Sequence, residues 1–270
     1  NEQAGSSLFN LPRELRDIVW AYATAPYEDP QAKFEESAYY CRPGHIARLK
    51  SDVALLLTCR RIWLEANAMP MLQAEHLYYF YRPAPDERTK WWMAQLSDHN
   101  RANFGHLHMY AQMCNIERLT ATPGALREFF LSKRLQAGDF QPRVFHVTIR
   151  HTDWWYWERE APLRLADRWV VALLNTPDLR STKVLKLELE TLDYKVDQLK
   201  PIVERLRDLN SEEKETHIIN GKPQRTKFVL HEKLETFNWE GPANIDGKKH
   251  APYADKSRLR YHVVTLTWHL

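Results

Sequence analysis

The second half of the chain alternates strand-like and helix-like segments, and this order constrains the fold more than any other feature. Strand-like runs occupy 144–149, 184–189, 228–230 and 261–268, and apolar residues recur at helical spacing in 163–174 and 197–209. Alternation of this kind favours parallel strands joined by right-handed crossovers. We therefore predict an α/β fold with an irregular, degenerate repeat-like strand–helix layer. A conventional α+β domain is the alternative.

The first half of the chain predicts two helices followed by a short aromatic strand. The first helix covers about 11–25, and the second runs from residue 51 to Pro70. The strand is expected at 77–81, after the second helix. The connection at 26–50 is expected to be irregular.

Apolar spacing within the two helices predicts which residues form their shared core. In the first helix the apolar positions recur at i, i+3, i+4 and i+7, which places them on one face. The corresponding seam of the second helix faces them, so we expect one contact cluster. Its predicted members are Leu15, Ile18, Leu55, Ile62 and Trp63.

Further elements are predicted between and after these segments. Helices are expected at 86–97, around Trp91 and Trp92, and again from residue 123. A strand is expected at 105–110, with Leu107 and Met109 on one face. The segment 240–258 is expected to be a polar loop, most of it solvated.

Composition narrows the class of protein. The chain has 270 residues and a net charge of +3, which is too small to indicate nucleic-acid binding by itself. Its three cysteines form no CxxC pair, which argues against a zinc ribbon and a disulfide framework and favours an intracellular compartment, cytoplasmic or nuclear. No apolar run approaches the roughly 20 residues of a membrane span, so no membrane partner is expected.

Two segments of the first half carry a recognisable pattern. The first is Phe-Asn-Leu-Pro-Arg-Glu-Leu-Arg-Asp-Ile-Val-Trp at 9–20. The second is Ala-Leu-Leu-Leu-Thr-Cys-Arg-Arg-Ile-Trp-Leu-Glu-Ala at 54–66, followed by an aromatic strand that ends in Tyr79 and Phe80. Together they resemble a large group of fungal F-box-like proteins, whose signature is a Leu-Pro-x-Glu-Leu-Arg helix and a Thr-Cys-Arg-x-Ile-x-x-Glu-Ala helix. The resemblance is specific over residues 8–81.

The same segments are similar, more distantly, to the true F-box. That module docks on a small adaptor of cullin-type ubiquitin ligases, and the domain that follows it captures the target. The resemblance thus implies an F-box-like helical module at 8–82 and an α/β recognition domain at 83–270 packed on it. It implies partner contacts at Leu11, Pro12 and Leu15. The connection at 26–50 is longer and more polar than a compact F-box would have.

A tryptophan-rich tract follows the predicted strand at 144–149. Consecutive aromatic residues there cannot all point inward, because alternate side chains of a strand point to opposite sides. We expect at least one indole to be exposed in a groove, with arginines beside it; an indole layer that caps the helices is the alternative. The candidate partner-binding residues are Arg150, Trp154, Trp155, Trp157 and Arg159.

Histidines supply a second hypothesis, a metal-dependent hydrolase. The alternating pair His106 and His108 shares a strand face, His146 lies in the next predicted strand, and His151 follows that strand. Because no closing ligand spacing is present, scattered histidines are the competing interpretation, and no metal or cofactor is assigned. A third hypothesis is nucleic-acid binding through Arg150, the tryptophans and Lys248-Lys249.

The sequence contains no GxSxG, HExxH, P-loop or GxGxxG signature. We therefore expect a non-enzymatic protein-interaction module, in which an F-box-like docking element is joined to an α/β recognition surface. A role as substrate adaptor of a cullin-type ubiquitin ligase falls within this expectation.

Overall fold

The computed structural model describes residues 5–80, 82, 96–97, 99–100, 103–121, 142–176, 179, 182–209, 212, 214–219, 222–249 and 256–270. Nearly all of the helix predicted at 86–97, including Trp91 and Trp92, and all of the helix predicted from residue 123 lie outside these ranges.

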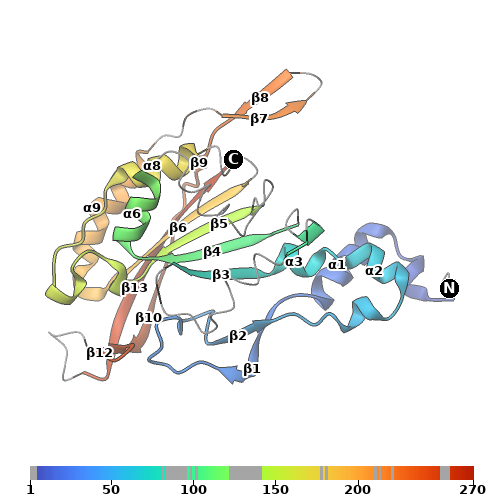
Figure 1. The fold of residues 1–270 in the computed structure, drawn as a ribbon, viewed down its shortest axis with the longest axis horizontal. Coiled ribbons are helices and arrows are strands. Elements are labelled where there is room, and N and C mark those ends of the chain that lie inside the picture. Colours follow the sequence, from blue (N-terminus) through green and yellow to red (C-terminus); the bar gives the residue numbers. More distant parts are fainter. Residues whose placement is uncertain are drawn as a thin grey trace.

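A seven-stranded mixed sheet forms the body of the molecule (Figure 1). The parallel strands are β3 (Glu75–Phe80), β4 (His106–Ala111), β5 (Val144–Ile149) and β6 (Val184–Leu192), adjacent in that order. The antiparallel strand β13 (Arg258–His269) lies beside β6 and also pairs with β10 (Glu235–Pro242) and the short β9 (Val229–Leu230). The prediction of a mixed helix and strand fold is confirmed, as is the parallel pairing of the strands at 144–149 and 184–189. The expectation of parallel strands is wrong for the strand at 261–268, which is antiparallel to both of its long neighbours, β6 and β10.

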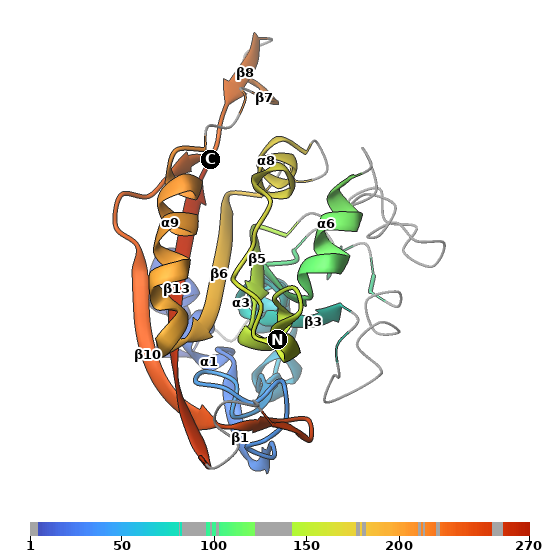
Figure 2. The same ribbon diagram turned by 90° about the vertical axis from the view of Figure 1, so that its left-hand side faces the viewer.

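Helices cover one face of this sheet. They are α6 (Met113–Ala121), α8 (Asp167–Asn175) and α9 (Val196–Arg207), and Figure 2 shows them in front of the strands. Their apolar sides and the alternate apolar residues of the strands form one large buried cluster, which includes Leu107, Met109, Trp169 and Leu206. The apolar residues that recur at helical spacing and those that alternate along the strands therefore pack against each other in this core.

The N-terminal helices lie at the other end of the molecule from α6, α8 and α9 (Figure 1). After a short 3₁₀ turn, η1 (Ser7–Asn10), they comprise α1 (Arg13–Ala23), the 3₁₀ turn η2 (Ala54–Leu57), α2 (Arg60–Ala66) and α3 (Met69–Gln73). The single helix predicted from residue 51 to Pro70 is thus broken. The hydroxyl of Thr58 donates a hydrogen bond to the carbonyl oxygen of Leu55 at 2.7 Å, and the backbone of Cys59 is extended. Pro70 lies in the first turn of α3 rather than ending a helix.

The inward face of α1 also differs from the prediction. Leu15, Ile18 and Trp63 are each about half exposed, so they do not belong to the predicted cluster. The buried residues are Trp20, Ile62 and Ala66, with Leu55 partly buried beside them. In this rotation of α1 the large Trp20 side chain is buried and its indole Nε1 donates to Glu65 of α2, so its polar atom has a partner.

The connection at 26–50 forms structure that the sequence did not predict. It folds into the hairpin β1 (Tyr27–Lys33) and β2 (Ala47–Lys50), and the loop between these strands reaches the second face of the sheet. Since β3 pairs with β4, the boundary expected at residue 82 falls between two neighbouring strands of one sheet.

The remaining elements are short. A hairpin of β7 (Lys214–Ile219) and β8 (Lys222–Thr226) projects from the body (Figure 1). A second hairpin of β11 (Asn244–Ile245) and β12 (Lys248–Lys249) falls inside the segment expected to be a loop. The 3₁₀ turns η3 (His151–Asp153), η4 (Trp157–Arg159) and η6 (Asp193–Lys195) follow β5 and β6.

Candidate functional site

The tryptophan tract after β5 is mostly buried. Trp154 is only 4% exposed, and its indole Nε1 donates to the Glu190 carbonyl at 2.8 Å. Trp157 is also buried, and Trp155 is partly buried against the core. The prediction of a substantially exposed indole is therefore wrong for Trp154 and Trp157, because the chain after β5 turns through η3 and η4 instead of extending the strand.

Arg150 is also inside the protein and not at a groove. It is 1% exposed, and its Nε lies 3.0 Å from the carboxylate of Glu190. Arg159 is exposed, as expected, and lies over the ring of Tyr156, the exposed aromatic residue of the tract. Base stacking on Trp154 next to Arg150 is excluded by this burial, which removes the main support for the nucleic-acid hypothesis.

The helical unit formed by α1, η2 and α2 exposes an apolar surface. Leu11, Pro12 and Leu15, the three residues implied by the F-box resemblance, are all exposed. Leu15 is 48% exposed, and the exposure continues along the same side of α1 to Tyr22. The exposed apolar residues of the unit are Leu11, Leu15, Ile18, Val19, Tyr22, Val53, Leu57, Trp63 and Leu64. We call this set the α1 face.

Glu65 holds the two helices in the arrangement that exposes the α1 face. Arg16 donates from Nε and Nη2 to the two carboxylate oxygens of Glu65 at 2.8 and 2.9 Å. The indole Nε1 of Trp20 donates to the same carboxylate at 3.1 Å. The hydrogen bonds from Arg16 lower the pKa of Glu65 to about 2. The side of α1 that carries Arg16 and Trp20 is therefore the side that docks on α2.

The second face of the sheet is polar and buried. Alternate residues of β4, β5 and β6 point to this side, and the loop of the β1–β2 hairpin covers them. Arg42 of that loop pairs with Glu188, and Tyr39 packs edge-on against Tyr79 and Tyr110. We call this layer the covered polar face.

Buried charges on the covered polar face are compensated by partners. Burial raises the pKa of Glu190, but the charges of Arg150 and Arg42 outweigh that effect, so its pKa is lowered. The hydroxyl of Tyr39 donates to Asp153 at 2.6 Å, and Arg82 pairs with the same carboxylate. Such paired groups tolerate burial, whereas removal of one partner leaves an uncompensated charge.

Histidines gather at one end of the covered polar face. His106 and His108 project from β4 and His146 from β5, and the three rings lie nearly parallel. The rings of His108 and His146 are 3.8 Å apart between centroids. His45 of the covering loop contacts His108 edge-on, and Glu75 of β3 lies beside this group.

These imidazoles are held neutral. Burial lowers the pKa of His45 and of His106, and it lowers the pKa of His108 and of His146 well below the ordinary value. Neutral imidazole has a free lone pair, the form that binds a metal ion. The sequence hypothesis named four histidines, and the structure brings three of them together. The fourth, His151, packs instead against Trp157 and Tyr261.

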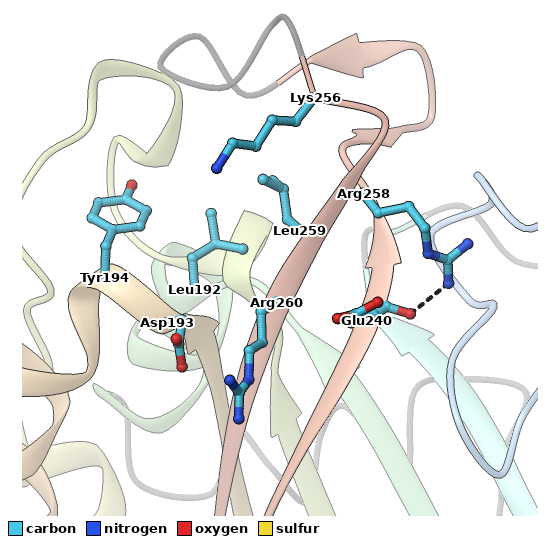
Figure 3. A pocket seen from close by; sticks show the side chains of 8 residues that line it. All are labelled: Leu192, Asp193, Tyr194, Glu240, Lys256, Arg258, Leu259 and Arg260. Carbon is cyan, nitrogen blue, oxygen red and sulfur yellow. Dashed lines mark hydrogen bonds between the residues drawn. The ribbon is translucent and has the colours of Figure 1, made fainter.

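A surface pocket of about 470 Å³ opens where β6 and β10 end and β13 begins (Figure 3). Its basic residues are Lys256, Arg258 and Arg260, and Asp193 and Glu240 supply negative charge. Figure 3 shows Arg258 turned toward Glu240, where its Nη2 donates to the Glu240 carbonyl at 2.7 Å.

Several of these residues were missed by sequence reasoning. Glu188 and Glu190 alternate with leucines in β6, a pattern typical of a solvent-facing strand side, yet both are buried. His45 and Glu75 could not be identified from nearby sequence, because His45 lies in the β1–β2 loop and Glu75 in β3, and the two come together only in the folded chain.

No helix in the described part of the chain is long and apolar enough to cross a membrane. Searches of protein-family models, curated proteins and solved structures found no match to this chain.

Proposed function

We propose that this chain is a non-enzymatic protein-interaction module whose α1 face docks on a partner protein. The observation that supports this most is the exposure of Leu15, Ile18 and Tyr22 along one side of a helix whose other side is fixed by Glu65. A contiguous exposed apolar patch is costly in water and commonly marks a protein-binding surface.

We further propose that the partner is the small adaptor of a cullin-type ubiquitin ligase. This step rests on the Leu-Pro-x-Glu-Leu and Thr-Cys-Arg-x-Ile patterns and on the exposure of Leu11, Pro12 and Leu15, the positions that the F-box resemblance assigns to docking. On this proposal the sheet domain presents the target-binding surface, and the basic pocket at Lys256, Arg258 and Arg260 is its best candidate site.

The test is a calorimetric titration of the purified chain with the adaptor. We expect one-to-one binding that Leu15→Asp weakens at least about 30-fold, since a buried interface anchor contributes roughly 2 kcal/mol or more. Leu15 is exposed, so the variant should keep its fold.

A matched pair of valines provides the control. Val19→Asp places a charge on the α1 face and should weaken binding, whereas Val229→Asp places the same charge on an exposed valine of β9, outside the helical unit. Absence of binding by the folded chain, or equal loss in both variants, would contradict adaptor docking.

A further inference from the structure

Glu75 is a carboxylate surrounded by imidazoles. Its Oε1 lies 2.6 Å from Nδ1 of His108 and 3.7 Å from Nε2 of His106, and its Oε2 lies 3.8 Å from Nε2 of His45. Among the residues that the structure describes, Glu75 has no arginine or lysine partner. A carboxylate that has imidazole nitrogens at 2.6, 3.7 and 3.8 Å and no basic partner of this kind offers a place for a cation.

We propose that Glu75, His106 and His146 bind a divalent transition-metal ion of the zinc class. Their ligand atoms all lie within 4.8 Å of one another. Two imidazole nitrogens and one carboxylate oxygen form a set that zinc accepts in open, three-ligand sites. This assignment goes beyond the proposed docking function and does not depend on it.

The distance between Glu75 and His106 fits shared coordination. Ligand atoms bound at 2.0–2.2 Å in a tetrahedron lie about 3.3–3.5 Å apart. The 3.7 Å between Glu75 Oε1 and His106 Nε2 is close to this value. The Nε2 atom of His106 is buried and has no hydrogen-bond partner in the described part of the chain, so its ligand position is free.

The neighbouring His108 orients Glu75 and is not itself a ligand. At 2.6 Å, its Nδ1 and the Glu75 oxygen are too close to share one tetrahedral ion but are well placed for a hydrogen bond. Imidazole hydrogen bonds to a ligating carboxylate are a regular feature of metal sites, because they fix the orientation of the carboxylate.

A different trio, His108, His146 and Glu188, is occupied by a hydroxyl. Thr148 Oγ1 lies 2.7 Å from His108 Nε2, 3.5 Å from His146 Nε2 and 3.0 Å from Glu188 Oε1. Glu188 is also paired with Arg42. The hydroxyl is thus closest to His108 and Glu188, and its contact with His146 is the longest of the three. Because His108 and Glu188 are engaged within the protein, the ion is assigned to the Glu75 side of His146.

Exposure gives the ion a route to the site. The side chains of Glu75 and His106 are about a quarter exposed, while His146 lies deeper. Lys186 neighbours His146 on β6 and opposes a cation, so the carboxylate of Glu75 is required for binding.

The experiment titrates the full chain, freed of metal by a chelator, with Zn²⁺ and with Co²⁺, whose visible spectrum reports coordination geometry. We expect one ion per chain, a four-coordinate Co²⁺ spectrum and a rise in the thermal unfolding midpoint. Mg²⁺ should not substitute, because it prefers six oxygen ligands.

Two variants locate the ion. His106→Gln and Glu75→Gln should each weaken Zn²⁺ binding about 100-fold or more, since loss of an outer partner alone costs 10–100-fold. His231→Gln removes an exposed histidine of the described chain and should leave the affinity unchanged.

Circular dichroism checks that each variant is folded. If His106→Gln unfolds, Glu75→Gln still tests the site, because glutamine has nearly the same size and shape as glutamate. Failure of the folded wild-type chain to bind Zn²⁺, or wild-type affinity in Glu75→Gln, would overturn the assignment. An equal loss in His231→Gln would place the ion on the surface and would overturn it as well.

Discussion

At the scale of single residues, Glu65 decides how the N-terminal helices pack. It accepts hydrogen bonds from Arg16 and Trp20, two residues one helical turn apart on α1. These two hydrogen bonds are directional, whereas apolar contacts are not, so they fix which side of α1 faces α2. The side of α1 that carries Leu15, Ile18 and Tyr22 is consequently left to solvent.

Glu65→Gln should lower the free energy of unfolding by about 2 kcal/mol near pH 7, since hydrogen bonds to charged groups contribute about 1.5–3 kcal/mol. The folded pKa of about 2 is below the ordinary 4.5, so this stability is complete above pH 4.5 and is lost as the pH falls toward 2. Denaturant unfolding at several pH values should show the difference between the two proteins disappearing in acid.

The control for this prediction is Glu204→Gln, which removes an exposed carboxylate paired with Arg207. It should change the stability by less than about 1 kcal/mol at any pH. A pH-independent effect of Glu65→Gln would show that its carboxylate charge is not what holds the helices.

Ile62→Ala and Leu15→Ala should separate the inner from the outer side of the helical unit. Ile62 is 7% exposed, so its truncation should cost about 2–5 kcal/mol of unfolding free energy. Leu15 lies on the α1 face, and its truncation should stay within about 0.5 kcal/mol. Thermal or denaturant unfolding measures both. Equal losses would mean that Leu15 is buried.

At the scale of elements, the central strands β4, β5 and β6 each have an apolar side and a polar side, and both are covered. The helices cover the apolar side, and the β1–β2 loop covers the polar side with residues that complete ion pairs. The strands at 144–149 and 184–189 and the inward residues of α8 and α9 could be predicted from periodicity, because apolar burial is a local, repeating signal.

The covered polar face could not be predicted in the same way. The alternating Lys-x-Glu-x-Glu of β6 is typical of a solvated side, and only the distant Arg42 and Arg150 make its burial tolerable. The orientation of α1 was likewise determined by Glu65, a residue 45 positions from Trp20. Contacts between residues that are far apart in the sequence produce no periodic pattern, so they could not be predicted from the sequence.

The ion pair of Arg150 and Glu190 provides the test at this scale. Arg150→Met should destabilise the protein by about 3–5 kcal/mol, because it leaves Glu190 buried without its closest cation. In the double variant with Glu190→Gln the loss should be smaller than the sum of the single losses, by about 1 kcal/mol or more. Denaturant unfolding of the four proteins measures this coupling.

Arg207→Met, in an exposed pair, should have almost no effect and serves as the control. Strict additivity of Arg150→Met and Glu190→Gln would contradict a direct interaction between the two side chains.

At the scale of the whole molecule, the N-terminal part and the sheet are structurally inseparable. β3 supplies a strand to the sheet, and the β1–β2 loop supplies partners to its buried charges. The helical unit, in contrast, projects beyond the sheet with its α1 face exposed (Figure 1).

Deletion of residues 1–82 should therefore abolish cooperative folding of the remainder, because it uncovers Glu188 and removes a parallel neighbour of β4. Near-ultraviolet circular dichroism and denaturant unfolding of the fragment 83–270 measure this. A cooperative transition at the midpoint of the full chain would show that the sheet domain folds alone.

Amide hydrogen exchange of the full chain, with and without the cullin-ligase adaptor, tests the docking proposal most directly. Our account predicts slower exchange in peptides that cover 8–24 and 53–66, where the residues of the α1 face lie. Peptides from 144–160, which hold the buried tryptophan tract, should exchange at an unchanged rate. Protection confined to the sheet domain, or no protection at saturating adaptor, would contradict the assignment of the α1 face as the docking surface.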